Sequence, residues 1–169
     1  MKQYLVALLS LIIVASACTA QQTNKQSSKS SAKQNAKPTF PKGKTEAEWK
    51  KILTPTQFQI MVKRGTETPF SNPYADNHEK GFYVSAATGD TLFSSETKFE
   101  SGTGWPSFYA PFGKNKVTVV KDDSYGMSRD EIIETSTGLH LGHVFNDGPK
   151  PTGLRYCMNS AAFKFIKSK

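Results

Sequence analysis

Cys157 is the residue of this chain best suited to chemistry, because it is the only cysteine after position 18 in the 169 residues. Arg155 and Asn159 lie two positions to either side of it. In an unbroken strand these three side chains point to the same face. A neighbouring cation favours the nucleophilic thiolate, and an amide can hold a substrate or a water molecule. The spacing favours a reactive thiol over the alternative, an inert buried one.

Two histidines, His140 and His143, precede this segment and are joined to it by a loop rich in Pro and Gly. Histidine exchanges protons near neutral pH and is therefore a candidate acid and base. Positions 140 and 143 fall on opposite faces of a regular strand, unless a bulge or a break at Gly142 turns one side chain around. The alternative is that both histidines are hydrogen-bonded partners of strand ends.

Two further residues are candidates for contact with a ligand. Trp105 lies between Gly104 and Pro106, and a residue before proline is held extended, so its ring can form a flat apolar wall. Packing in the core is the alternative for this ring. Asp147 precedes Gly-Pro and is either a site residue or an ordinary turn residue.

The elements that must position these residues are short. Thr45 to Glu48 matches a capping box at the start of a helix, and Thr54-Pro55 starts a second helix that we expect to end at Gly65. From Gly81 onward, short runs rich in Val, Phe, Tyr and Thr alternate with turn residues, which predicts strands. The expected strands are 81–85, 91–94, 117–121, 127–134, 140–146, 154–158 and 163–166. Helices followed by strands indicate an α+β or mainly β domain of antiparallel sheets.

The N-terminus predicts export. Lys2 precedes an apolar run at 4–14, and the small residues Ala15-Ser-Ala17 come directly before Cys18. This resembles the lipobox of bacterial lipoproteins, so residues 1–17 are expected to be a lipoprotein signal peptide and Cys18 the lipidated residue. The alternative is an ordinary signal peptide cut near Ala20. The apolar run is too short for a membrane span, which needs about 20 residues.

Residues 18–44 read as a flexible basic linker, rich in Gln, Ser, Asn and Lys. Six lysines of this linker and Lys2 account for seven of the 22 basic residues, so 15 remain against 14 acidic ones in the domain at 45–169. The positive charge therefore belongs to the linker. A nucleic-acid partner is not expected, since it would need a basic surface on the domain itself.

Four blocks carry a resemblance to a known family: residues 101–108, 140–145, 147–149 and 153–160. In this order they resemble the signature blocks of the methionine-R-sulfoxide reductases, the MsrB family, over about residues 44–165. The resemblance implies a domain of two antiparallel β-sheets. It also implies that Cys157 attacks the sulfoxide sulfur of oxidised proteins or peptides and becomes a sulfenic acid. We expect a monomer without a cofactor.

The resemblance also assigns the other candidates. Trp105 corresponds to the residue that receives the substrate methyl group. His140, His143 and Asn159 correspond to residues that position and protonate the sulfoxide oxygen. Asp147 and Arg155 correspond to supporting residues of the substrate site.

Two departures from the family pattern are informative. Many members bind a structural zinc ion through four cysteines, at positions that are Ser85, Thr88, Glu134 and Thr137 here, so no metal is expected. The usual resolving cysteine corresponds to Thr103. The sulfenic acid is therefore expected to be reduced by an external thiol, from a thioredoxin-like or glutaredoxin-like protein.

Three rival hypotheses remain open at this point. His140, His143 and Cys157 can act as ligands of zinc or copper. A Cys-His pair can also serve a cysteine peptidase or transpeptidase. The third possibility is a non-catalytic surface lipoprotein that binds oxidised or methionine-rich partners.

Overall fold

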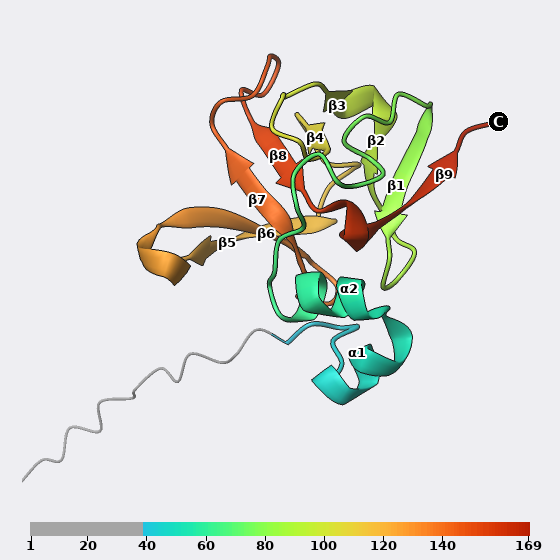
Figure 1. Ribbon diagram of the computed structural model, residues 1–169, viewed down its shortest axis with the longest axis vertical. Coiled ribbons are helices and arrows are strands. Elements are labelled where there is room, and N and C mark those ends of the chain that lie inside the picture. Colours follow the sequence, from blue (N-terminus) through green and yellow to red (C-terminus); the bar gives the residue numbers. More distant parts are fainter. Residues whose placement is uncertain (1–38) are drawn as a thin grey trace, which may run out of the picture. The chain divides into compact units, whose positions relative to one another are not determined.

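The computed structural model describes residues 39–169, so the predicted signal peptide, Cys18 and most of the linker lie outside the described residues. The domain contains two antiparallel sheets, of strand order β2-β1-β9 and β3-β4-β8-β7-β6-β5 (Figure 1). The strands are β1 Gly81–Ser85, β2 Thr91–Ser94, β3 Lys98–Phe99, β4 Ser107–Phe108, β5 Val117–Asp122, β6 Arg129–Glu134, β7 His140–Phe145, β8 Arg155–Met158 and β9 Phe163–Lys167. The expected mainly β fold with two antiparallel sheets is confirmed.

Two short helices precede the sheets, as predicted, and lie together at the lower end of the domain in Figure 1. Helix α1 (Glu46–Ile52) begins with the predicted capping box of Thr45 and Glu48. Helix α2 (Pro55–Gln57) begins at the predicted proline but widens at once into the π-helical turn η1 (Phe58–Val62). π-Turns are frequent at functional sites. This one packs against strand β7, in the interior of the larger sheet.

The predicted strands are all present, with ends that differ by a few residues at most. Strands β3 and β4 lie in a segment for which the sequence predicted a loop or no structure. Each has two residues, too few to show an alternating pattern. Three 3-10 turns complete the elements: η2 Ser95–Thr97, η3 Ser124–Gly126 and η4 Ser160–Ala162.

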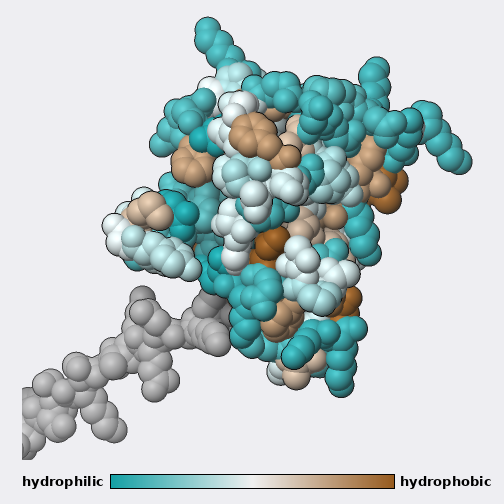
Figure 2. Space-filling view, viewed as in Figure 1, coloured by the Kyte–Doolittle hydropathy of each residue, from teal (hydrophilic) through white to brown (hydrophobic). Residues whose placement is uncertain are grey.

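The two sheets are joined by an aromatic core. Phe93 of the smaller sheet stacks on Phe108 of the larger sheet with ring centroids 4.6 Å apart, and Tyr83 meets Phe108 edge-on at 5.0 Å. All three side chains are fully buried. On the face shown in Figure 2, hydrophobic residues appear as separate patches among hydrophilic ones. The aromatic core holds the short strand β4 in place, and β4 lies beside the strand that carries Cys157.

A buried hydrogen-bond cluster occupies the place where many family members are expected to carry zinc. The carboxylate of Glu134 accepts hydrogen bonds from Ser85 at 3.1 Å, Thr88 at 2.6 Å and Thr137 at 2.7 Å. Glu134 is 1% exposed. Four side chains thus tie the β1–β2 turn to the β6–β7 turn, which are far apart in sequence.

The segment just before α1 also contacts the domain. The backbone N–H of Lys42 donates to the carbonyl of Ser136, and its ammonium group lies 2.7 Å from the carboxylate of Asp90. Within residues 39–169, no helix is both long enough and apolar enough to cross a membrane.

Candidate active site

A small cavity of about 130 Å³ opens beside Cys157 on one face of the larger sheet. Four of the residues predicted for the site line it. They are Trp105, His143, Cys157 and Asn159. His140, Asp147 and Arg155 do not line the cavity. His140 contacts Asn159 and Arg155 lies over the ring of Phe145, whereas Asp147 is bound to Arg155. The remaining lining residues are Thr66, Arg129, Gly142, Phe145 and Met158.

The strand register explains why these side chains meet. Strand β8 lies between β4 and β7, and Cys157 is directly opposite both Ser107 and His143. Residues directly opposite on neighbouring strands point to the same face, with their Cβ atoms about 5 Å apart. His143 is in turn opposite Glu131 of β6. A polar row, Ser107, Cys157, His143 and Glu131, therefore crosses four strands.

The thiol of Cys157 is half-buried and lies 3.9 Å from the hydroxyl of Thr103. Burial raises the pKa of Cys157 above its ordinary value. The Thr103 hydroxyl, the guanidinium of Arg155 and the Ser107 hydroxyl oppose this effect by favouring the thiolate. The resting cysteine is thus mainly a thiol, with the groups that stabilise the thiolate already in place.

Arg155 and Asp147 form one rigid unit beside the thiol. The guanidinium donates from Nε and Nη2 to the two carboxylate oxygens, at 2.9 and 2.8 Å. It also lies over the ring of Phe145, 4.5 Å from the centroid. Asp147 is exposed, and Arg155 shares the face of Cys157 two positions away. The pair therefore places a fixed positive charge near the sulfur.

His143 is held by a carboxylate. Its Nε2 lies 2.8 Å from Oδ2 of Asp122, and because a carboxylate only accepts, Nε2 carries the proton. Burial lowers the pKa of His143, although Asp122 opposes this effect. The ring is therefore neutral near pH 7, with Nδ1 unprotonated and free to take or return a proton at the cavity.

His140 lies behind the cavity. Its side chain is 2% exposed, and Nδ1 lies 2.6 Å from Oε1 of Glu131. Burial lowers its pKa to about 4, so the ring is neutral and Nε2 accepts from the amide of Asn159 at 3.4 Å. His140 thus contacts Asn159 of the cavity wall without lining the cavity itself.

A bulge turns the two histidines towards each other. Ile132 is opposite Gly142 and Ile133 opposite His140, which leaves Leu141 as the extra residue. The two imidazole rings consequently approach to 5.4 Å between centroids. A side chain at Gly142 would clash with the carbonyl oxygen of Cys157, so glycine permits this close approach of β7 and β8.

Trp105 and Asn159 are fixed by one residue that the sequence did not reveal, Glu67. Its carbonyl accepts from Trp105 Nε1 at 3.1 Å, and its N–H donates to Oδ1 of Asn159 at 3.1 Å. Its carboxylate accepts from the backbone N–H groups of Ser160 and Ala161. These partners lie 38 to 94 residues away along the chain, so no local pattern indicates the role of Glu67.

Sequence reasoning also missed Asp122, Arg129 and Glu131. A signal was present, because Arg129 and Glu131 are alternate residues of a predicted strand and therefore share a face. Pairing that strand with the histidine strand would have placed Glu131 beside His143. Nothing in the sequence favours that pairing over the others.

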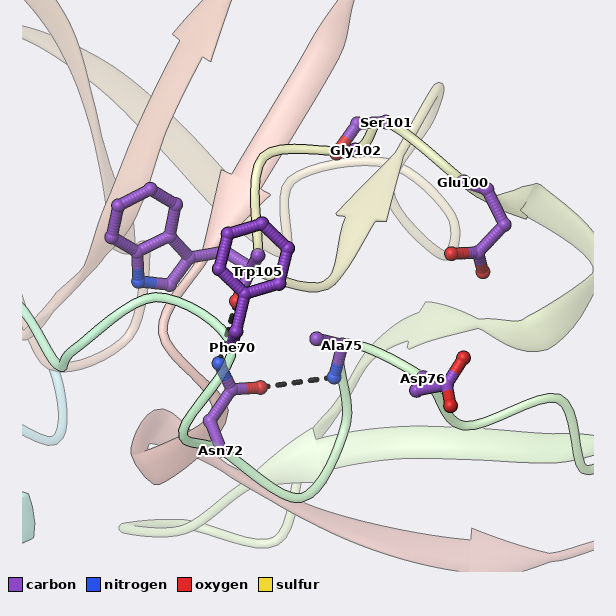
Figure 3. Close-up of a pocket in the computed structure, with 9 residues that line it drawn as sticks. Phe70, Asn72, Ala75, Asp76, Glu100, Ser101, Gly102 and Trp105 are labelled. Atoms are coloured by element: carbon purple, nitrogen blue, oxygen red, sulfur yellow. Dashed lines mark hydrogen bonds between the residues drawn. The ribbon is translucent and has the colours of Figure 1, made fainter.

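A second pocket of about 290 Å³ lies on the other side of Trp105 (Figure 3). Phe70 and Trp105 line one end of it, and the carboxylates of Asp76 and Glu100 stand at the other end. Phe70 is 74% exposed, and its N–H donates to the carbonyl of Gly104. Trp105 thus lines both this pocket and the cavity beside Cys157.

The fold and the cavity define a small β-sheet domain with one half-buried cysteine in a cavity, beside an aromatic ring and a neutral histidine. Within the part of the chain that the structure describes, no three His, Cys, Asp or Glu side chains gather as a metal site would need.

Comparison with known proteins identifies the family. Residues 53–167 match the model of the SelR domain. The chain is 56% identical over 124 residues to the peptide methionine sulfoxide reductase MsrB of Leptospira interrogans, covering 73% of this chain and 95% of that protein. It is 55% identical over 122 residues to the MsrB of Methanosarcina barkeri, covering 72% and 86%. The chain belongs to the MsrB family of peptide methionine sulfoxide reductases.

Proposed function

We propose that this protein reduces methionine-R-sulfoxide in oxidised proteins and peptides, and that Cys157 carries the reaction through a sulfenic acid. The observation that carries the proposal is the placement of the thiol, Trp105 and His143 around one cavity. The overall step is balanced, since a thiol and a sulfoxide yield a sulfenic acid and a thioether. The oxygen moves from the substrate sulfur to Cys157, which is oxidised as methionine is formed.

The contacts support one role for each neighbour. The Trp105 ring offers an apolar wall for the methyl group on the substrate sulfur, and it is fixed through Nε1. Nδ1 of His143 can take the proton of Cys157 and deliver it to the departing oxygen. Asn159 has both amide hydrogens directed to protein acceptors, Leu141 O and His140 Nε2, so it shapes the cavity rather than donating to substrate.

The recycling step is proposed to need an external thiol. A hydroxyl, Thr103, stands beside the sulfur where the family usually has a second cysteine. A thiol from a thioredoxin-like or glutaredoxin-like protein, or a small thiol, would attack the sulfenic sulfur and release water. A second thiol would then free Cys157 from the mixed disulfide.

Export and lipid anchoring are also part of the proposal. The signal layout of residues 1–17 and the position of Cys18 support a lipoprotein held at a bacterial membrane, periplasmic or on the cell surface. Two or more acyl chains hold a protein at a bilayer stably, whereas one chain does not. The linker would let the domain reach oxidised proteins near that membrane.

A stereospecific assay tests the proposed activity. Peptides carrying R- or S-methionine sulfoxide are offered with dithiothreitol to the wild type and to Cys157→Ser. We expect reduction of the R form alone, and none by the variant. Reduction of the S form, or activity in Cys157→Ser, would contradict the proposal. Capture of a sulfenic acid by a specific probe, with no reductant present, tests the intermediate.

A further inference from the structure

Arg129 is the one cation among the side chains that line the cavity, as far as the described residues go. It belongs to β6, and its side chain is 26% exposed. It also borders a third cavity, of about 430 Å³, which shares Thr66 and His143 with the cavity beside Cys157. Arg129 therefore stands at the junction of the two cavities, beside the histidine that faces the thiol.

Only some of the hydrogen-bond donors of the Arg129 guanidinium have partners in the protein. Nη2 donates to Oδ2 of Asp122 at 2.7 Å and approaches the hydroxyl of Ser124 at 3.5 Å. Nε is buried and has no hydrogen-bond partner among residues 39–169. An arginine offers five N–H donors, and leaving a buried one unpaired costs about 1–3 kcal/mol. Such a donor calls for a partner that the protein itself does not supply.

Asp122 couples Arg129 to the histidine. The same oxygen, Oδ2, accepts from Nη2 of Arg129 and from Nε2 of His143. Asp122 is opposite Arg129 in the β5–β6 register, and its side chain is 12% exposed. One carboxylate thus fixes both groups in a single orientation towards the cavity.

We propose that Arg129 donates a hydrogen bond to the sulfoxide oxygen of the substrate, and that Asp122 positions Arg129 for this contact. The inference rests on the proposed reduction of methionine sulfoxide. A sulfoxide oxygen already carries partial negative charge, and it gains more as the sulfur of Cys157 forms its bond to the substrate sulfur. A cationic donor, held in place before the reaction, stabilises that charge.

The residues of the cavity account for every proton that moves in the proposed reaction. His143 removes the proton of Cys157 through Nδ1, and the thiolate attacks the substrate sulfur. Negative charge gathers on the sulfoxide oxygen as the sulfur–sulfur bond forms, Arg129 donates a hydrogen bond to that oxygen, and His143 returns the proton there. Transfer of the hydroxyl to the cysteine sulfur then leaves a sulfenic acid and methionine, with no proton gained or lost overall.

The test compares two reactions of the same thiol. Wild type, Arg129→Ala and Arg129→Lys are assayed for reduction of R-methionine sulfoxide peptide and for alkylation of Cys157 by iodoacetamide, which has no sulfoxide oxygen. We expect Arg129→Ala to lose about 100-fold or more in kcat/KM, a loss typical of a deleted oxyanion donor. Arg129→Lys keeps the charge but not the planar group and should be intermediate. Alkylation should stay near the wild-type rate in both.

Further variants distinguish a direct contact between Arg129 and the substrate from a structural role of Arg129. Lys121→Ala removes an exposed cation of the same hairpin, 2.7 Å from Asp130, and should behave as wild type. Added guanidinium ion should restore part of the activity of Arg129→Ala. Asp122→Asn should lower kcat and change its pH profile, because it also loosens His143.

Wild-type kcat/KM in Arg129→Ala would overturn the inference while leaving the proposed function intact. An equal fall in reduction and alkylation would also overturn it, since Arg129 would then act on the thiol. Absence of sulfoxide reduction by the wild type would remove both proposals together. If Arg129→Ala does not fold, Arg129→Lys allows the same comparison of sulfoxide reduction with alkylation, with a smaller expected loss.

Discussion

The hydroxyl of Thr103 lies 3.9 Å from the sulfur of Cys157, close enough that a sulfur atom in its place would reach that of Cys157. We expect Thr103→Cys to convert the protein to a two-cysteine enzyme. After one turnover with sulfoxide and no reductant, the variant should contain an internal disulfide and no probe-reactive sulfenic acid. Intact mass, 2 Da below the reduced form, and a thiol titration would measure this.

Thr103→Ser is the matched control, since it keeps the hydroxyl and adds no thiol. It should remain a one-cysteine protein whose sulfenic acid persists until an external thiol is added. A persistent sulfenic acid at Cys157 beside a free thiol at position 103 in Thr103→Cys after sulfoxide treatment would show that the two positions do not meet during turnover.

Arg155 is expected to act through the pKa of the thiol. Its guanidinium opposes the rise in pKa that burial imposes on Cys157. Removing it in Arg155→Ala should raise that pKa further, so alkylation by iodoacetamide should be several-fold slower at pH 7 and its midpoint should move to higher pH. Lys164→Ala, an exposed cation of β9, is the control. An unchanged alkylation profile in Arg155→Ala would contradict this role.

At the scale of elements, the buried carboxylate of Glu134 joins two turns through three hydroxyl donors. Glu134→Ala should lower the free energy of unfolding by about 3 kcal/mol or more, because it leaves buried hydroxyls without acceptors. Glu134→Gln keeps one acceptor oxygen and should cost less. Urea unfolding would measure both, with the exposed Glu96→Ala expected within about 0.5 kcal/mol of the wild type.

The elements show where sequence reasoning works and where it stops. Strands of four or more residues carry alternating or β-rich patterns, and all of them were predicted. The bulge at Leu141 was one of two explanations for the histidine spacing, and only the register with Ile132 and Ile133 decides between the explanations. Glu67 forms hydrogen bonds with Asn159 and Ser160, which lie more than 90 positions away, and no local pattern encodes such contacts.

For the molecule as a whole, His140 links stability to pH. Its pKa is lowered to about 4 in the folded state, against an ordinary value near 6.5 in the unfolded chain. Between these values the unfolded state binds more protons, so stability falls as pH drops from about 6.5 to 4 and then levels off. The loss amounts to about 3 kcal/mol at most. Urea unfolding against pH should show this slope in the wild type and not in His140→Asn.

Comparing the wild type with His140→Asn isolates the effect of His140 from that of other groups that titrate between about pH 4 and 6.5. Glu67 has a pKa raised by burial, and so it favours the folded state as pH falls, but it does so in both proteins. Parallel pH profiles in wild type and His140→Asn would therefore show that the ring is not buried in its neutral form.

The charge of the whole chain is uneven, since the linker and Lys2 carry seven of the 22 basic residues while the domain at 45–169 is almost neutral. If Cys18 carries the anchor, membrane attachment and catalysis belong to separate parts. We expect Cys18→Ser to move from the membrane fraction to the soluble exported fraction, and to keep wild-type kcat/KM on a soluble sulfoxide peptide, because Cys157 lies in the folded domain. Fractionation at high salt distinguishes a lipid anchor from attraction of the lysines to anionic lipid, which salt would screen. A Cys18→Ser protein that stays with the membrane at high salt would refute the lipid anchor.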